Sequence, residues 1–217
     1  MNEKNISELN YWRKKRAEEG GHFKNACLID GTPYEYFYTD FFGIDKKEFT
    51  NKKILDIGCG PRGSLDWLSE QSKCFGLDPL AEEYMKINPS IKMDLIKGNL
   101  ETFDTDVRFD FVCTFNSLDH VDDLSRSIYN LHKLCSPNGT LLLIADIHEE
   151  PTKLEPSAFN WDISQTLSRI GFKILSERHY EKHNTDGMYQ SLLNPVAFDH
   201  NSLKKRYGII AIKAKLA

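Results

Sequence analysis

The chain has 217 residues, 40% of them hydrophobic, which suits one compact domain with a sizeable core. Its 28 Lys and Arg against 32 Asp and Glu give a formal net charge of −4, so we expect no broad surface for nucleic acid. The five cysteines include no C-x-x-C pair, the amino terminus lacks an apolar signal core, and no run reaches the roughly 18 apolar residues of a membrane span. These features favour a cytoplasmic protein that does not enter a membrane.

The first 50 residues differ in pattern from the rest of the chain. Ile6, Leu9 and Trp12 recur at helical spacing, and an aromatic stretch follows them. The aromatic residues are Tyr34, Tyr36, Phe37, Tyr38, Phe41 and Phe42. These rings either pack the segment onto the main body or form a lid that keeps water from a ligand. We therefore expect a cap over residues 1–50 and the main part of a single structural domain over 51–217.

After residue 50, apolar strand patterns alternate with helical patterns, which is typical of a mostly parallel α/β sheet covered on both faces. The predicted strands are residues 53–57, 73–77, 92–96, 109–115, 140–147, 172–180 and 206–214. Helices are predicted over 124–135, ending at the turn Pro137-Asn138-Gly139, and over 157–170, ending at Gly171.

A glycine-spaced turn follows the first of these strands. Gly58, Gly60 and Gly63 fit the pattern G-x-G-x-x-G, in which the first two glycines allow a sharp turn close to a ligand. The third lets a following helix pack closely against the strand. Asp78, twenty-two residues after Asp56, is suitably spaced to accept hydrogen bonds from ribose hydroxyls. The arrangement predicts a cofactor that contains a nucleoside.

Asp56 helps to decide which nucleoside cofactor is bound. It lies two residues before Gly58, where a dinucleotide would bring its pyrophosphate and a carboxylate would repel it. S-adenosylmethionine carries an ammonium and a sulfonium instead, and a carboxylate stabilises both. A nicotinamide-dependent oxidoreductase remains an alternative that must tolerate Asp56.

At this point the chain resembles the class I S-adenosylmethionine-dependent methyltransferases, over roughly residues 50–150. Leu55 to Gly60 looks like the first motif of that family. Gly76-Leu77-Asp78 looks like the end of its second strand, with Asp78 as the ribose-binding acid. Lys97 to Glu101 resembles the segment beside the adenine, where Asn99 replaces a frequent aspartate.

The same resemblance implies a Rossmann-like, seven-stranded, mostly parallel sheet with helices on both faces and a closing antiparallel pair. It also implies S-adenosylmethionine as the cofactor and S-adenosylhomocysteine as the product. The expected cofactor-binding residues are Asp56, Gly58, Cys59, Gly60, Gly63, Asp78, Pro79, Asn99, Leu100 and Asn116.

Two histidines follow central strands and are candidates for the general base. His120 comes just after the fourth strand, where Asp119 could orient it or act alone, and His148 follows the fifth strand. Asp146, His148 and Glu149 offer metal ligands in a short span, but their spacing matches no strong metal signature, so we expect no metal. A polar segment near the sixth strand, which includes residues 187–190, is expected to help select the acceptor.

The absence of two sequence patterns limits the methyl acceptors that we expect. The fourth strand does not end in the Asn/Asp-Pro-Pro-aromatic sequence associated with methylation of exocyclic base amines, and no paired-glutamate loop suits an arginine. We therefore expect methyl transfer to a polar small molecule, such as a sugar or secondary metabolite, with O-methylation favoured over N-methylation. A non-catalytic subunit that only binds the cofactor is the alternative outside enzymes.

Overall fold

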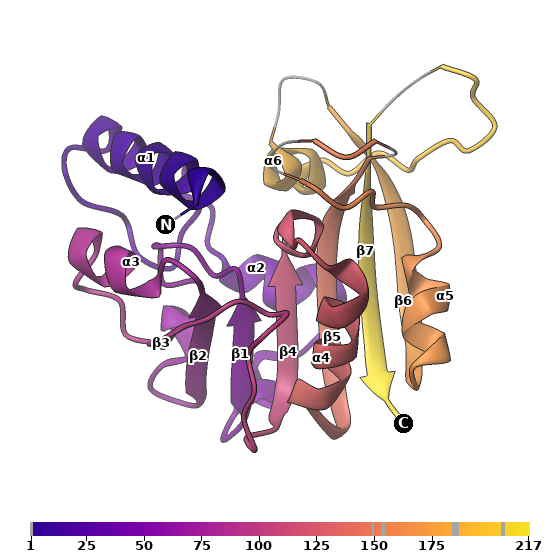
Figure 1. Cartoon of the computed structure of the whole chain (residues 1–217), viewed down its shortest axis with the longest axis horizontal. Coiled ribbons are helices and arrows are strands. Elements are labelled where there is room, and N and C mark those ends of the chain that lie inside the picture. The colour runs from indigo at the N-terminus through magenta and orange to yellow at the C-terminus, as the bar shows by residue number, and fades with distance from the viewer. Residues whose placement is uncertain (1, 149, 153–154, 184–186, 205–206) are drawn as a thin grey trace.

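The computed structural model describes residues 2–148, 150–152, 155–183, 187–204 and 207–217. Its centre is a seven-stranded sheet with the order β3-β2-β1-β4-β5-β7-β6 (Figure 1). The strands are β1 (Lys53–Ile57), β2 (Lys73–Asp78), β3 (Asp94–Lys97), β4 (Phe109–Phe115), β5 (Cys135–Ile147), β6 (Phe172–Lys182) and β7 (Tyr207–Leu216). The expected Rossmann-like architecture is confirmed.

The pairing of the strands brings several carboxyl ends to one edge of the sheet. β1 pairs in parallel with β2 and β4, and β2 pairs in parallel with β3. β5 continues the parallel part, and β7 runs antiparallel to both β5 and β6. All seven predicted strands are present, although β5 begins before residue 140, because the turn predicted at Pro137 to Gly139 forms an irregularity within the strand.

One face of the sheet is covered by α4 (Leu124–Leu134) and α5 (Ile163–Arg169) (Figure 1). Asp123 caps α4 by accepting a hydrogen bond from the Arg126 backbone N–H at 2.9 Å, and the helix buries its periodic apolar residues, as its pattern predicts. α5 begins at Ile163 rather than at the expected residue 157.

The opposite face is covered by the aromatic segment and by α6 (Met188–Leu193). The aromatic segment, residues 34–49, contains α2 (Glu35–Tyr38) and two 3₁₀ helices, Asp40–Phe42 and Lys46–Phe49. Its rings pack against the sheet: Phe49 lies 4.3 Å from Phe111 and Tyr38 lies 4.7 Å from Phe115 between ring centroids. These rings therefore form part of the core. The division into a cap and a main part stays a prediction.

The helix expected directly after the glycine turn is absent, and that expectation was wrong. Only the 3₁₀ helix Asp66–Leu68 follows Gly63. The Asp66 carboxylate folds back instead, so that it accepts hydrogen bonds from the backbone N–H groups of Lys92 and Met93, and a Cβ on Gly63 would lie 2.3 Å from one of its oxygens. The aromatic segment covers the face that a longer helix would occupy.

Two further helices lie at the carboxyl edge of the sheet. α1 (Glu3–Glu18) packs against α3 (Ala81–Ile87) through a small cluster that contains Leu9, Leu80 and Tyr84 (Figure 1). Leu9 is the single buried residue of α1. No helix among the described residues is long and apolar enough to cross a membrane.

Candidate active site

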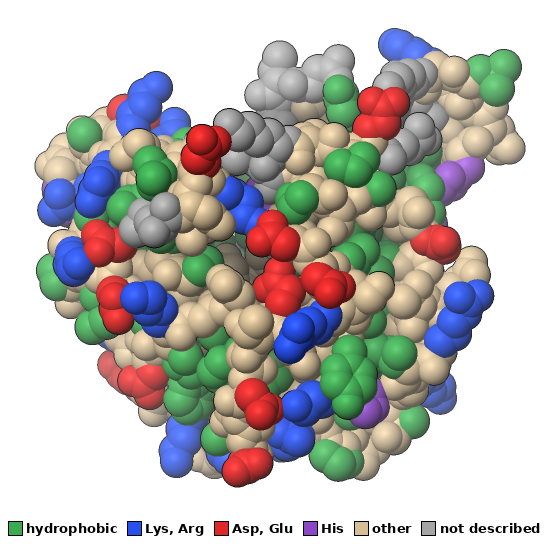
Figure 2. Space-filling model, viewed as in Figure 1, with side chains coloured by type: hydrophobic (Ala, Val, Ile, Leu, Met, Phe, Trp, Pro, Cys, Tyr) green, Lys and Arg blue, Asp and Glu red, His purple; other side chains and the backbone are tan. Residues whose placement is uncertain are grey.

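A cavity of about 580 Å³ opens at the carboxyl edge of the sheet, beyond the ends of β1, β2 and β4. Its volume lies within the range of small-molecule sites. α1, residues 28–38 and α6 supply its other walls. Figure 2 shows a hollow near the middle of the viewed face, with acidic side chains gathered beside it. In a parallel sheet this edge is where ligands bind.

The glycine turn forms the floor of the cavity. Gly58 and Gly60 have φ angles of 70° and 60°, in the left-handed region that glycine adopts without strain. A Cβ on Gly58 would lie 2.3 Å from the Cβ of Ser117, and one on Gly60 would lie 3.4 Å from the Trp12 ring. The sequence therefore needs glycine here, and the turn presents its backbone to the cavity.

Asp56 lies at the carboxyl end of β1 and is 3% exposed. Burial raises the pKa of this carboxyl to about 7, although hydrogen bonds from Ser64 and Tyr38 lower it. Because the buried carboxylate lacks a cationic partner among the described residues, a positively charged ligand in the cavity would stabilise its ionised form.

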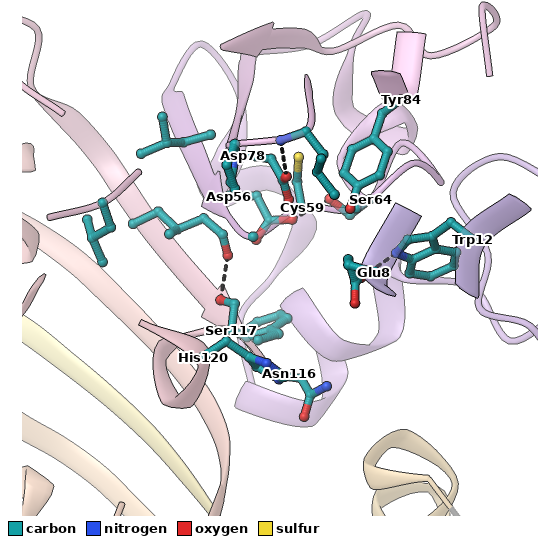
Figure 3. A pocket seen from close by; sticks show the side chains of 18 of the residues that line it. Glu8, Trp12, Asp56, Cys59, Ser64, Asp78, Tyr84, Asn116, Ser117 and His120 are labelled. Atoms are coloured by element: carbon teal, nitrogen blue, oxygen red, sulfur yellow. Dashed lines mark hydrogen bonds between the residues drawn. The ribbon is translucent and has the colours of Figure 1, made fainter. Parts of the chain in front are cut away.

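Asp78 ends β2 beside Asp56 (Figure 3). It accepts a hydrogen bond from the Leu80 backbone N–H at 2.8 Å, and burial raises its pKa to about 7. Asn99 and Leu100 follow β3 and line the cavity next to it. Asn130 on α4 donates to the Leu100 carbonyl at 2.7 Å and fixes this segment.

Nearly all the expected cofactor-binding residues come together around this cavity. Those that line it are Asp56, Gly58, Cys59, Gly60, Asp78, Pro79, Asn99, Leu100 and Asn116. Gly63 is the exception, since it lies beneath the turn against Asp66. Their contacts with a cofactor stay a prediction, but the walls needed for those contacts are present.

The two candidate bases lie in different places. His120 lines the cavity, and Figure 3 shows it beside Ser117 and Asn116. His148 does not line the cavity. Its backbone pairs with Phe159, and its Nδ1 lies 3.3 Å from the Glu150 carbonyl.

Asp119 lies buried directly behind His120. Its Oδ1 is 4.0 Å from the His120 Nε2, and within the described part of the chain neither carboxylate oxygen has a hydrogen-bond partner. Burial raises the pKa of Asp119, while the nearby His120 lowers it. Protonation of the imidazole would therefore supply the counter-charge that this carboxylate lacks.

Three of the described residues could approach one metal ion together. Ligand atoms of Asp119, His120 and Glu155 all lie within 4.8 Å of one another. The possible metal ligands considered from the sequence, Asp146, His148 and Glu149, do not form such a group among the described residues. Asp146 pairs with Lys182, and Glu149 lies outside the described residues.

Sequence reasoning missed the residues that α1 contributes to the cavity, whereas its lid alternative had already placed the aromatic segment over a ligand. Glu8 and Trp12 line it from α1, and Tyr34 and Tyr38 line it from the aromatic segment. Tyr189 on α6 lies 6.2 Å from Tyr34 between ring centroids. The spacing of Glu8 and Trp12 by four residues on one helix face was the available signal.

Residues 36–182 match the family described as a methyltransferase domain, and the chain belongs to this family. The resemblance to class I S-adenosylmethionine-dependent methyltransferases is thereby confirmed.

Curated relatives include the mitochondrial ubiquinone biosynthesis O-methyltransferase of Schizosaccharomyces pombe, 29% identical over 56% of this chain and 45% of that protein. The chloroplastic tocopherol O-methyltransferase of Arabidopsis thaliana is 22% identical over 56% of this chain and 38% of that protein. The chain thus spans about half the length, or less, of the curated relatives it matches.

The fold is also found in solved structures. A TehB-like S-adenosylmethionine-dependent methyltransferase from Corynebacterium glutamicum has a TM-score of 0.60 and 15% identity, with 98% of this chain and 100% of that chain covered. The [4+2]-cyclase SpnF has a TM-score of 0.66 and 13% identity, with coverage of 98% and 94%. At these identities the likeness establishes the fold alone.

Proposed function

We propose that this chain transfers a methyl group from S-adenosylmethionine to a hydroxyl group of a small molecule. The observation that carries the proposal is the pair of buried carboxylates, Asp56 and Asp78, at the ends of neighbouring parallel strands beside the glycine turn. The membership of the methyltransferase-domain family and the O-methyltransferase relatives support the same reaction.

The residues around the cavity fit this cofactor. Asp56 has no cationic partner in the described part of the chain, so it would hold the cationic methionine end. Asp78 would accept hydrogen bonds from the ribose. Asn99 and Leu100 would border the adenine. When bound, the sulfonium supplies an electrophilic methyl group. The pocket walls would hold the acceptor oxygen in line with this methyl group and would exclude water.

The remaining wall of the cavity favours an acceptor with an aromatic or apolar face. Tyr34, Tyr38 and Phe115 form most of it together with Met188 and Tyr189 of α6, and Gln190 of the same helix adds one amide. Such a wall suits a hydroxylated ring better than the strongly polar sugar that the sequence left open, because ring faces bury well against aromatic side chains. Relatives named for ubiquinone and tocopherol support this choice.

His120 is proposed as the general base. An alcohol or phenol must lose its proton as the new bond forms, and an imidazole on the cavity wall is suited to accept it. The buried Asp119 carboxylate behind it would stabilise the imidazolium that results.

Calorimetry with S-adenosylhomocysteine tests the cofactor assignment. The wild-type chain should bind it, and Asp78→Asn should weaken binding by about tenfold or more, because a charge-assisted hydrogen bond is lost. Asp94→Asn is the matched control, since Asp94 is an exposed residue of β3 away from the cavity. Absence of binding by the wild type would refute the proposal.

Turnover then tests the chemical step. A panel of hydroxylated aromatic compounds should contain an acceptor that yields S-adenosylhomocysteine at a rate above the background. If the chain binds the cofactor but methylates no member of wide panels of phenols, sugars and amines, the reading as a non-catalytic binding subunit replaces the proposed one.

A further inference from the structure

α1 forms one complete wall of the cavity. Lys4, Glu8, Tyr11 and Trp12 all line it from this helix. The Trp12 ring lies against Gly60 at one end, and the Lys4 ammonium donates to the His120 carbonyl at 2.7 Å and to Asp122 at 2.8 Å at the other. The helix therefore extends from the glycine turn to the loop after β4.

Glu8 projects a carboxylate from the middle of this helix. The Trp12 Nε1 donates to its Oε1 at 2.5 Å, and this is its one hydrogen bond among the described residues. Figure 3 shows Glu8 lying between Trp12 and the wall that carries Asp56 and Asp78. Glu8 and Asp78 line the same cavity, and Trp12, which donates to Glu8, lies against Gly60, whose backbone donates to Asp78. Burial raises the pKa of Asp78 most, and the negative charge of Glu8 raises it further.

Asp78 already accepts backbone hydrogen bonds. The Leu80 N–H donates to its Oδ1 at 2.8 Å, and the Gly60 backbone also donates to this carboxylate. A ribose presents two neighbouring hydroxyl groups, and each is a hydrogen-bond donor. A second carboxylate beside the first would let each hydroxyl donate to a different side chain. Because a carboxylate has roughly four acceptor sites, each side chain could accept this bond in addition to its bonds within the protein.

We infer that Glu8 is a second ribose-binding carboxylate, which accepts a hydrogen bond from one hydroxyl of the cofactor ribose while Asp78 accepts from the other. The inference rests on the proposed cofactor and names a contact from α1 to it. The same contact would join α1 to the bound cofactor. Without a ligand, the two like charges oppose each other across this part of the cavity.

The test compares two ligands by calorimetry: S-adenosylhomocysteine and its analogue without the ribose 2′- and 3′-hydroxyls. Glu8→Gln keeps the size of the side chain and an oxygen for Trp12 but removes the charge. It should weaken S-adenosylhomocysteine binding about fivefold and leave the affinity for the analogue unchanged. Glu18→Gln is the control, because Glu18 lies on the same helix, exposed and paired with Lys14 and Lys15.

The outcomes separate this inference from the proposed function. If the wild type binds S-adenosylhomocysteine and Glu8→Gln binds it equally well, the ribose contact is refuted and the cofactor assignment stands. Equal weakening for both ligands also overturns the inference, because Glu8 would then act through the position of α1. If the wild type binds neither ligand, the proposed function itself fails.

Discussion

The cavity has two walls of different origin. The sheet wall consists of strand ends and the glycine turn, with Asp56 and Asp78 fixed by parallel pairing. The cap wall consists of α1, the aromatic segment and α6, which come from three separate parts of the chain. The positions of the residues in the sheet wall follow from backbone pairing between strands. The positions of those in the cap wall depend on contacts between side chains from different segments. Changes in the sheet wall should affect binding of the cofactor. Changes in the cap wall should affect binding of the acceptor or the closing of the site, except at Glu8, which is inferred to contact the cofactor ribose.

The largest expected effect falls between the two walls, at His120. His120→Gln should lower kcat by about a hundredfold or more, because the acceptor hydroxyl loses its base. Binding of S-adenosylhomocysteine should change little. His148→Gln is the control, since His148 does not line the cavity. Turnover measured across pH checks this, and equal rates for wild type and His120→Gln would remove His120 from the role.

A smaller but still large effect is expected on the sheet wall at Gly58. An added Cβ would lie 2.3 Å from the Cβ of Ser117, and alanine would have to adopt the left-handed φ of 70° found at this position. Gly58→Ala should therefore lower the free energy of unfolding by about 1 to 2 kcal/mol for the left-handed backbone and by about 1 to 3 kcal/mol for the overlap.

Gly43→Ala provides the matched comparison for this change. Gly43 has a φ of 62°, and no atom of the described residues lies within 4 Å of an added Cβ, so Gly43→Ala should show only the cost of the left-handed backbone. Denaturant unfolding of both variants measures the difference. Equal losses in the two would contradict the close contact between Gly58 and Ser117.

The smallest expected effect is a gradual dependence of stability on pH. The pKa values of Asp56 and Asp78 are raised to about 7 in the folded chain, above the ordinary value of 3.8. Between these pH values the folded state binds more protons than the unfolded state. The free energy of unfolding should therefore fall as pH rises towards 7, by at most about 1.4 kcal/mol per pH unit for each carboxyl.

Ligand binding should follow the opposite trend. Affinity for the cationic S-adenosylmethionine should rise as pH increases from about 6 to 8, because both carboxyls become ionised. Asp56→Asn should flatten this dependence, and calorimetry at several pH values measures it. A wild-type affinity independent of pH would show that neither carboxyl titrates in this range.

Much of the sheet wall could be predicted from the sequence because its signals are local. Apolar runs predicted all seven strands, and the spacing of the glycines predicted a turn in which they adopt positive φ angles, as they do in the structure. The helix after Gly63 was wrong because a tertiary contact prevailed: Asp66 turns back to the backbone at Lys92 and Met93. The pattern G-x-G-x-x-G contains no information about that partner.

The sequence by itself determined a turn typical of nucleoside-cofactor sites, two acids at strand ends and the positions of the strands along the chain, since each depends on spacing within one segment. Only the tertiary structure decided that Glu8 lines the same cavity as Asp78, that the rings of Tyr34 and Tyr189 meet, and that His120 rather than His148 reaches the cavity. The first two depend on segments far apart in the chain that pack together, and the third depends on the paths that the chain takes after β4 and β5, so no local pattern predicts them.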